Sequence, residues 1–236
     1  MEHKFQPYIV DISKFKNTEP RIRVFLDLLG NVNEKEILEI GCGISELSVY
    51  LAKIGGKVTC IDILPEAVEY TKSLVEFNNV SSRVSVFQMS ALDISGRYDL
   101  IVGKYVLHHI EPFEKLAEVL FNSLKDGGRG VFLENSSANP ILMFSRKYLA
   151  GRFGIPKYGD ENEFPLEPRE IEILKNKFSE VRLYFPEFIF FRKATTYLFH
   201  GNYLSYKVTK FLDNSVYHLF PFLRKYSYEQ IVEIVK

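Results

Sequence analysis

The sequence predicts an α/β fold with a doubly wound, mostly parallel sheet of seven strands. Between residues 36 and 134, short apolar or β-branched runs alternate with amphipathic stretches of helical period, which is the pattern of repeated β-α units. After residue 135 this alternation stops, and two further apolar runs near residues 181 and 228 supply the last strands. Neither an internal repeat nor a low-complexity linker is visible in the chain.

The individual elements follow from these runs in order. Pro65 and Pro112 each stand at the start of an amphipathic stretch, where a first helical turn tolerates proline, so they mark two helix starts. The expected strands are residues 36–40, 57–62, 83–88, 98–103, 128–134, 181–185 and 228–235. The expected helices are residues 45–54, 65–77, 112–124, 141–152, 168–177 and 195–224.

Length, charge and cysteine content limit the class of protein. The 236 residues suffice for one domain with a sizeable insertion. Lys plus Arg equals Asp plus Glu at 30 each, which argues against a nucleic-acid partner and favours a small substrate. Cys42 and Cys60 lack metal-ligand spacing, so we expect buried free thiols and no metal site. The first residues resemble no secretory signal, and no apolar run reaches about 18 residues, so we expect a cytoplasmic protein, at most peripheral to a membrane.

The strongest local signal is the segment ILEIGCGISELS, residues 37–48. Gly41 and Gly43 lack a Cβ, so they permit a tight turn after the first strand and a close approach of backbone N–H groups to a ligand. Asp62 ends the next strand, where a carboxylate can accept two hydrogen bonds from a ribose diol. Glu46 stands where the nicotinamide-binding G-x-G-x-x-G turn has its third glycine, and this bulky charged residue argues against tight pyrophosphate packing.

With these residues the sequence resembles the class I S-adenosylmethionine-dependent methyltransferases over most of residues 36–134. Five pieces stand in the family's order: the glycine turn, the acid that ends the second strand, and the segments VFQMSALDI, YDLIVGKYVLHHIEP and LKDGGRGVFLEN. The family's sheet closes with an antiparallel last strand, which YEQIVEIV would supply. The resemblance implies a Rossmann-like methyltransferase fold, S-adenosyl-L-methionine as cofactor, and methyl transfer to an oxygen, nitrogen or carbon atom of a small molecule.

The resemblance also assigns residues to the cofactor. In the family pattern Asp62 meets the ribose, Ile63 packs on the adenine, and Glu39 supports the methionine amino group, with a salt bridge to a neighbouring strand as the alternative for Glu39. Ser90 replaces the family's usual aspartate near the adenine, and Asp93 is the alternative partner. The residues expected at the cofactor are Glu39, Gly41, Gly43, Asp62, Ile63, Ser90, Ala91, Gly103 and Lys104.

The sequence gives fewer signals for the residues that contact the methyl acceptor. Direct transfer from the sulfonium needs mainly alignment, and a base only where the nucleophile keeps its proton at neutral pH. His109 is the preferred base, because a histidine at its place acts beside the substrate in related phosphobase methyltransferases. His108 is the second candidate, and packing of the short helix is the alternative for both. Glu134 and Asn135 end the fifth strand and either contact substrate or cap the next turn, and Tyr8 belongs either to a cap over the substrate or to the core.

Residues 1–236 are expected to form one methyltransferase domain. Its parts are an N-terminal cap (1–35), the cofactor-binding core (36–135), an insertion (136–180), and the last strands with a helical aromatic lid (181–236). The acidic loop GDENE, residues 159–163, is interpreted as solvated surface, with binding of a cationic substrate group as the alternative. Residues 188–228 are rich in Phe, Tyr and basic residues, and Asp213 is their only acid, so peripheral membrane contact is the alternative to core packing.

Other functions remain open from the sequence alone. One is a membrane-associated methyltransferase for a lipid, quinone or isoprenoid-like acceptor. Another is a catalytically inactive S-adenosylmethionine-binding scaffold, which the replacement by Ser90 favours. A nicotinamide oxidoreductase is disfavoured by Glu46 and by the missing Tyr-x-x-x-Lys pair. Adenine methylation of nucleic acid is disfavoured because Lys104, Tyr105 and Val106 occupy the place of an Asn/Asp-Pro-Pro-aromatic turn.

Overall fold

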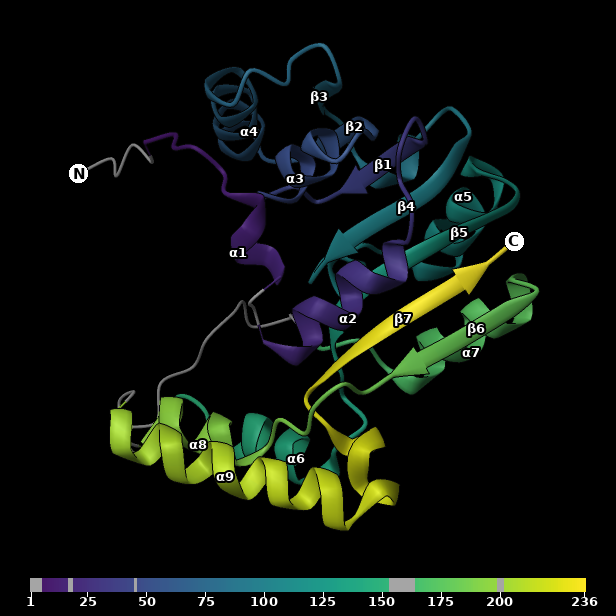
Figure 1. Ribbon diagram of the computed structural model, residues 1–236. Helices are drawn as coiled ribbons and strands as arrows, with labels where there is room; N and C mark the ends of the chain where they lie inside the picture. Colours follow the sequence, from purple (N-terminus) through teal and green to yellow (C-terminus); the bar gives the residue numbers. More distant parts are fainter. Residues whose placement is uncertain (1–5, 17–18, 45, 153–163, 199–201) are drawn as a thin grey trace.

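The computed structural model describes residues 6–16, 19–44, 46–152, 164–198 and 202–236. One sheet of seven strands has the order β3-β2-β1-β4-β5-β7-β6 (Figure 1). β1 to β5 run parallel, and β7 lies antiparallel between β5 and β6. The strands are β1 (Glu36–Ile40), β2 (Lys57–Asp62), β3 (Val84–Gln88), β4 (Tyr98–Lys104), β5 (Leu124–Asn135), β6 (Glu180–Tyr184) and β7 (Glu229–Val235). The predicted α/β fold with an antiparallel last strand is confirmed.

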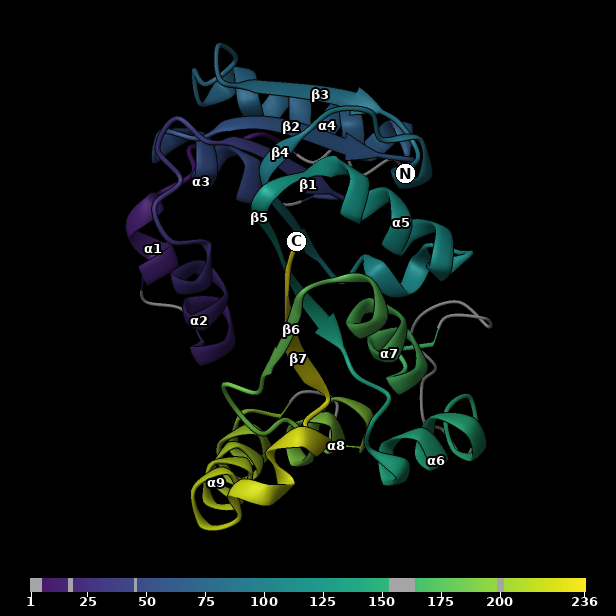
Figure 2. The ribbon, with the colours of Figure 1, turned by 90° about the vertical axis from the view of Figure 1, so that its right-hand side faces the viewer.

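Helices cover both faces of this sheet, and Figure 2 shows α2 and α7 on opposite sides of it. One buried cluster joins α2, α3 and α4 to the sheet, and a second joins α5 and α7 to the opposite face. The helices on the sheet are α2 (Pro20–Leu29), α3 (Leu47–Lys53), α4 (Pro65–Phe77), α5 (Phe113–Ser123) and α7 (Pro168–Lys177), with the short α1 (Ile12–Lys16) before α2.

The strands send alternate residues into the two clusters, which explains their nearly continuous apolar sequences. In β1, Ile37 packs under α2 to α4, whereas Leu38 packs under α5 and α7. Val131 and Phe132 of β5 divide between the clusters in the same way. Because both faces of the sheet are buried, its polar chemistry gathers at the strand ends.

Two boundaries near the core differ from the predictions by two residues or more, and the helix predicted over residues 141–152 ends at Tyr148. β5 begins at Leu124 and not at residue 128, because the chain after α5 already pairs with β4 at Tyr98 and turns through Gly127 at a φ of +72°. The helix predicted from residue 45 begins at Leu47. α2 was predicted only as part of a cap, although Pro20 stands at its first turn. Ser45 and the loop 159–163 lie outside the described residues.

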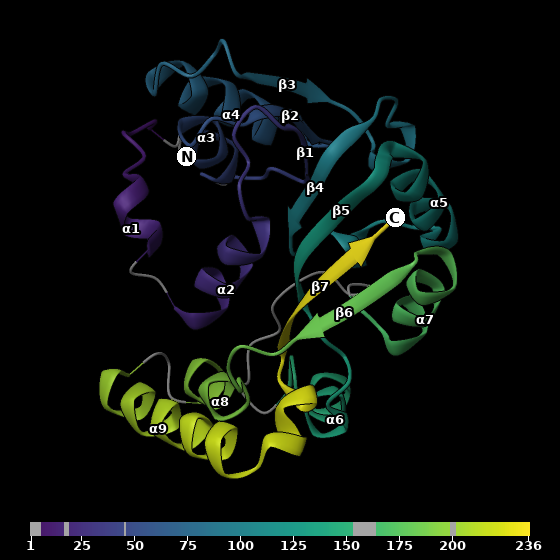
Figure 3. The same cartoon turned by 45° about the vertical axis from the view of Figure 1, so that its right-hand side comes forward.

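The stretch predicted to be helical, residues 195–224, is helical over most of its described length but is divided into separate helices. The structure has α8 (Phe191–Leu198), α9 (Tyr203–Leu219) and the 3₁₀-helix η3 (Pro221–Tyr226). Asn202 starts α9 with a side-chain oxygen that accepts the N–H of Leu204 at 2.9 Å, and Pro221 cannot continue that helix. With α6 (Pro140–Tyr148), these helices lie at the end of the sheet where β5 stops and β7 starts (Figure 3). None of the helices in the described ranges has the length and hydropathy of a membrane span.

Candidate functional site

The turn after β1 has a conformation that glycine adopts without strain. Gly41 and Gly43 have φ values of +66° and +50°, in the left-handed region. A Cβ on Gly41 would lie 2.4 Å from Cγ2 of Val106, whereas a Cβ on Gly43 would meet no atom within 4 Å. A Cβ on Gly103 would also strike Val106, at 2.6 Å. Gly41 and Gly103 therefore let the turn after β4 pack closely, and Gly43 leaves backbone accessible at the carboxyl edge.

Asp62, the last residue of β2, binds the same turn. Its Oδ2 accepts the N–H of Gly43 at 2.8 Å, and its Oδ1 accepts the N–H of Leu64 at 2.9 Å. Each carboxylate oxygen can accept a further hydrogen bond, so these contacts leave capacity for a diol. Asp62 was predicted only as a ligand contact, and the structure adds that its carboxylate fixes the glycine turn.

Glu39 lies buried in β1 beneath the turn. One carboxylate oxygen accepts a short hydrogen bond from the hydroxyl of Ser48 in α3. Burial raises the pKa of Glu39 to about 7, while the Ser48 hydrogen bond and the charge of Lys104 act to lower it. Burial also lowers the pKa of Lys104, against the charges of Glu39 and Glu46. In the described part of the chain, Glu39 also accepts a weak hydrogen bond from the thiol of Cys60 at 4.0 Å but forms no ion pair, so its carboxyl suits a positively charged ligand group.

The residues predicted beside the adenine divide between surface and core. Ile63 is 66% exposed directly after β2. Ser90 begins the 3₁₀-helix η1 (Ala91–Asp93), and its Oγ accepts the N–H of Leu92 at 3.2 Å. Ala91 packs in the core under α5, whereas Asp93 is exposed. Ile63 and Ser90 therefore lie at the carboxyl edge, while Ala91 supports the edge from below.

Tyr8 lies against the glycine turn. Its hydroxyl donates a short hydrogen bond to Glu46, the residue before α3, and its side chain is 45% exposed. Asn78 fixes the adjoining chain, because its amide accepts the N–H of Val10 at 2.8 Å and donates to the carbonyl oxygen of Tyr8 at 2.9 Å. Burial, followed by Glu46, raises the pKa of Tyr8. The N-terminal segment is thus fastened beside the site, and Tyr8 is not a core tyrosine.

The two histidines of the 3₁₀-helix η2 (Leu107–His109) have different surroundings. Nδ1 of His108 lies 2.6 Å from Oε2 of Glu134, and the two side chains are 2% and 0% exposed. Oε1 of Glu134 accepts the N–H groups of Val106 and Leu107, both at 2.9 Å. His109 is exposed, and its ring centroid lies 4.1 Å from that of His108. Glu134 therefore fixes the turn after β4 and the ring of His108, whereas the ring of His109 lies at the surface.

Asn135, the other residue predicted at the end of β5, remains at the edge. It is half-buried and pairs with Glu229 across β5 and β7. Glu134 is fully buried, and its carboxylate is engaged by η2, whereas Asn135 stays partly exposed at the end of β5. Cys42 and Cys60 are buried free thiols, as predicted.

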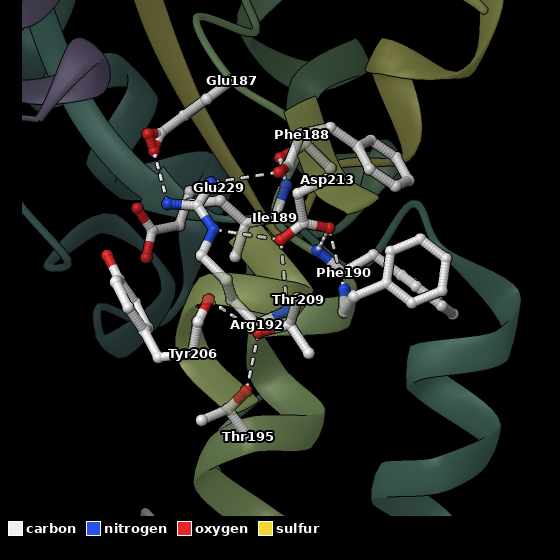
Figure 4. Close-up of polar contacts among 12 residues, drawn as sticks. Glu187, Phe188, Ile189, Phe190, Arg192, Thr195, Tyr206, Thr209, Asp213 and Glu229 are labelled. Carbon is white, nitrogen blue, oxygen red and sulfur yellow. Dashed lines mark hydrogen bonds and ion pairs between the residues drawn. The ribbon is translucent and has the colours of Figure 1, made fainter. Parts of the chain in front are cut away.

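Asp213 of α9 is the centre of a buried polar cluster that the sequence did not reveal (Figure 4). Its carboxylate accepts the N–H groups of Phe190, Phe191 and Arg192 at 3.1, 2.8 and 3.1 Å, and Nε of Arg192 at 3.0 Å. Asp213 therefore binds the start of α8 and fastens it to α9. The one available signal was that Asp213 is the only acid in a basic, aromatic segment.

Further charges connect this cluster to the sheet. Glu187 Oε1 lies 3.1 Å from Nη1 of Arg192 and 3.2 Å from Nη1 of Arg21 in α2. Arg21 Nε lies 2.5 Å from Oε2 of Glu229, the first residue of β7. We call Arg21, Glu187, Arg192, Asp213 and Glu229 the lid network. It joins α2, α8, α9 and β7 at the same edge as the glycine turn.

Comparison with known proteins identifies the family. Residues 15–173 match a family model described as a methyltransferase domain. The chain belongs to this methyltransferase family. The match and the sheet order together confirm the resemblance to the class I S-adenosylmethionine-dependent methyltransferases, whose cofactor is S-adenosyl-L-methionine.

Curated relatives match this methyltransferase over part of their length. A ribosomal protein L11 methyltransferase of Dechloromonas aromatica is 32% identical over 115 residues, which are 48% of this chain and 37% of the relative. A ubiquinone biosynthesis O-methyltransferase of Xanthomonas axonopodis pv. citri is 30% identical over 120 residues, 48% of this chain and 50% of the relative. The chain thus spans half or less of the length of these two proteins.

Solved structures share the fold at low identity. The O-methyltransferase of a trans-AT PKS multienzyme of Brevibacillus brevis, in complex with S-adenosyl-L-homocysteine, has a TM-score of 0.61 at 19% identity and covers 94% of this chain and 73% of its own. The magnesium protoporphyrin IX methyltransferase of Synechocystis PCC 6803, also with bound S-adenosylhomocysteine, has a TM-score of 0.57 at 16% identity, with coverages of 90% and 79%.

Proposed function

We propose that this methyltransferase transfers the methyl group of S-adenosylmethionine to a small-molecule acceptor at the carboxyl edge of β1, β4 and β5. The observation that carries the proposal is the glycine turn, in which the Asp62 carboxylate binds the N–H of Gly43 and so fixes backbone at the edge. The cofactor supplies an electrophilic methyl group on a sulfonium. The protein's contribution is to hold donor and acceptor in line.

The residues at this edge fit the charges of the cofactor. Asp62 has free lone pairs for the ribose hydroxyls, and the buried carboxyl of Glu39 suits the methionine ammonium. Gly43, Gly103 and Lys104 lie beside the methionine part in this arrangement. Ile63 and Ser90 adjoin the adenine.

For an acceptor that keeps its proton, such as an alcohol, we assign the base to His109. It is the exposed ring of η2, whereas His108 is enclosed with Glu134. His108 and Glu134 then position His109 by fixing the short helix on which it stands. Asn135 and Tyr8 are the remaining candidates for acceptor contacts, one at the end of β5 and one in the N-terminal segment.

The test of this function combines binding with product detection. Calorimetry with S-adenosylhomocysteine measures cofactor binding, and NAD serves as the negative control. Mass spectrometry of a cell extract incubated with the enzyme and methyl-labelled S-adenosylmethionine then identifies the labelled metabolite. Binding without any labelled product would support the inactive scaffold, and absence of binding would refute the proposal.

We further propose that α9 and η3 contact an anionic membrane surface. Large apolar side chains of α9 and η3 are exposed to solvent. The charged residues near them are basic, because the only acid of residues 188–228 is the buried Asp213. Such a face matches a membrane surface that carries negative headgroups. Its apolar residues with more than half of their surface exposed are Tyr203, Leu204, Val208, Phe211, Leu219 and Phe222, and its basic residues are Lys207, Lys210, Arg224 and Lys225.

Sedimentation with vesicles tests the membrane contact. The protein should sediment with phosphatidylserine vesicles at low salt and be released as salt screens the basic residues. Charge reversal of Lys207 and Lys210 to Glu should abolish sedimentation, whereas the same change at exposed Lys72 on α4 should not. Equal sedimentation of all three proteins, or none at any salt, would refute the membrane contact and leave the methyl transfer proposal untouched.

A further inference from the structure

An open groove lies at the end of β6 and is lined by α2, by the last residues of β6 and by η3. In the part of the chain that the structure describes, β6 is the edge strand of the sheet and pairs only with β7 (Figure 3). The volume of the groove is about 680 Å³, which is within the range of about 300–1,000 Å³ for small-molecule sites. Its apolar lining consists of Val24, Leu183, Phe185, Pro186, Pro221 and Phe222.

This apolar wall is exposed to solvent. Phe222 is 68% exposed, and Leu183 and Phe185 are only half-buried. Tyr184 adds its ring to the wall, while its hydroxyl is engaged outside the groove and donates to Oε2 of Glu233 at 2.7 Å. An alkyl chain lying along this wall would remove apolar surface from water on both the ligand and the protein.

Arg224 lines the same groove with a guanidinium that is fixed at one end. Its Nε donates to the carbonyl oxygen of Tyr217 at 2.9 Å, and its Cζ lies 4.0 Å from the centroid of the Tyr217 ring. Among the residues that the structure describes, none accepts a hydrogen bond from its two Nη atoms. These two atoms form a planar fork that matches the two oxygens of a carboxylate.

The charged residues that line the groove are all basic. They are Arg224 and Lys225, and neither lies within ion-pair distance of a carboxylate in the described ranges. Glu172 lines a neighbouring hollow with Lys225, but it pairs with Lys175 at 2.7 Å. The buried carboxylates of the lid network contact the arginines of that network. The groove therefore combines an exposed apolar wall with two cations that lack an acidic partner there.

We propose that this groove binds a long-chain carboxylate of the fatty-acid type, with its alkyl chain along the apolar wall and its carboxylate on Arg224 and Lys225. A purely apolar ligand would leave the two cations unmatched, and a small anion would leave the wall in water. The groove lies at β6, three strands from β4 in the sheet order, so the inference does not depend on the proposed methyl transfer. It shares η3 with the proposed membrane face, and a test with single ligand molecules separates the two.

The chain contains no tryptophan, which supplies a direct test of the position. Phe222→Trp puts the only indole of the protein at the groove. Phe77→Trp, at a 47% exposed residue of α4, is the matched control. Dodecanoate, added below its critical micelle concentration, should shift the emission of Phe222→Trp to shorter wavelength and saturate at one molecule per protein. The emission of Phe77→Trp should not change.

Calorimetry with the wild-type chain separates the contributions of the alkyl chain and the carboxylate. Decanoate, which is two CH₂ groups shorter, should bind about tenfold more weakly than dodecanoate. Arg224→Gln should weaken dodecanoate binding by about tenfold or more, and Arg224→Lys should recover part of the affinity, because it keeps the charge without the fork. Arg169→Gln, at an exposed arginine of α7, is the control and should bind as the wild type does. Phe222→Ala, at a side chain that is mostly exposed, should weaken binding without loss of the fold.

The inference would be overturned by any of several results. Equal affinity for the neutral dodecyl maltoside, or unchanged affinity in Arg224→Gln, would mean adsorption to an apolar surface only. If dodecanoate monomers do not bind although the protein sediments with vesicles, the groove is part of the membrane face and not a ligand site. A dimer in sedimentation velocity that Phe222→Ala dissociates would show that a second copy of the chain covers the groove.

Discussion

The glycine turn and the lid network lie at the same edge of the sheet, but their parts are brought together over different sequence distances. Gly43 and Asp62, which meet in the turn, are separated by 19 residues, and Asp62 binds Leu64 two residues later. In the lid network, Arg21 and Glu187 are separated by 166 residues. The difference teaches that a glycine turn and its carboxylate can be predicted from short motifs, whereas a network of ion pairs between residues distant in the sequence cannot.

The largest expected effect tests whether the lid network depends on its central carboxylate. Asp213→Asn breaks one of the two ion pairs of the buried Arg192 and weakens three backbone hydrogen bonds, so we expect a loss of about 3–5 kcal/mol in the free energy of unfolding. Urea denaturation measures it. Asp126→Asn, at a carboxylate that is 96% exposed, is the control. A loss equal to that of the control would mean that the α8 start is held by other contacts.

The next largest effect is a loss of turnover, and it concerns the two histidines of η2. His109→Ala should lower turnover about a hundredfold or more with unchanged cofactor affinity, because a general base typically contributes 10² to 10⁴. His108→Ala should have a smaller effect on turnover, and it should also destabilise the fold because Glu134 loses a partner. Steady-state kinetics and calorimetry separate the two variants. Equal, small losses from both would assign the histidines to packing, or the reaction to a nucleophile that needs no base.

A smaller effect is expected within the cofactor region. Asp62→Ala removes the acceptor of the Gly43 N–H and of the ribose hydroxyls, each worth roughly 1.5–3 kcal/mol, so affinity for S-adenosylhomocysteine should fall at least tenfold. Calorimetry measures it, and Asp62→Asn should lose less because one oxygen is retained. Unchanged affinity in Asp62→Ala would remove this residue from the site.

The smallest expected effect is the number of protons released when the cofactor binds. The pKa of Glu39 is raised to about 7, so the carboxyl is mostly protonated at pH 6 before the cofactor binds. A cofactor ammonium beside it would lower that pKa, and binding at pH 6 should release up to one proton, falling to none near pH 9. Calorimetry in buffers of different ionisation enthalpy counts the protons. Glu39→Gln should release none at pH 6, and an equal release from this variant would exclude Glu39 as the source.

The same buried carboxyl affects stability with a definite sign. A carboxyl whose folded pKa exceeds its unfolded value near 4.5 favours the folded state below about pH 4.5 relative to higher pH. This contribution is lost as pH rises toward 7. Glu39→Gln should therefore gain stability relative to the wild type when the pH is raised from 5 to 8, as measured by denaturation at the two values.

Elements defined by a local pattern could be predicted from the sequence, whereas contacts that depend on strand register could not. The bounds of β1, β2, α4 and α7 agree with the predictions, because local periodicity and an initial proline define them. The roles of Glu134 and Glu229 were not predictable, because alternate residues at a strand end face opposite clusters and only the register decides which charge meets which partner. The break before α9 depends on the cap of one asparagine, Asn202, within an otherwise helical pattern.

The position of β7 has a consequence for the order of assembly. β6 pairs with β7 alone, and β7 joins β5 across about 100 residues of chain, so the β6 edge cannot attach to the parallel strands before β7 docks. β7 begins with Glu229, and α8 and α9 lie between β6 and β7 in the sequence. The ion pairs at this edge of the sheet can therefore form only after β7 has paired with β5. We therefore expect the nascent protein to gain the ability to hold its cofactor before it gains the ability to select an acceptor.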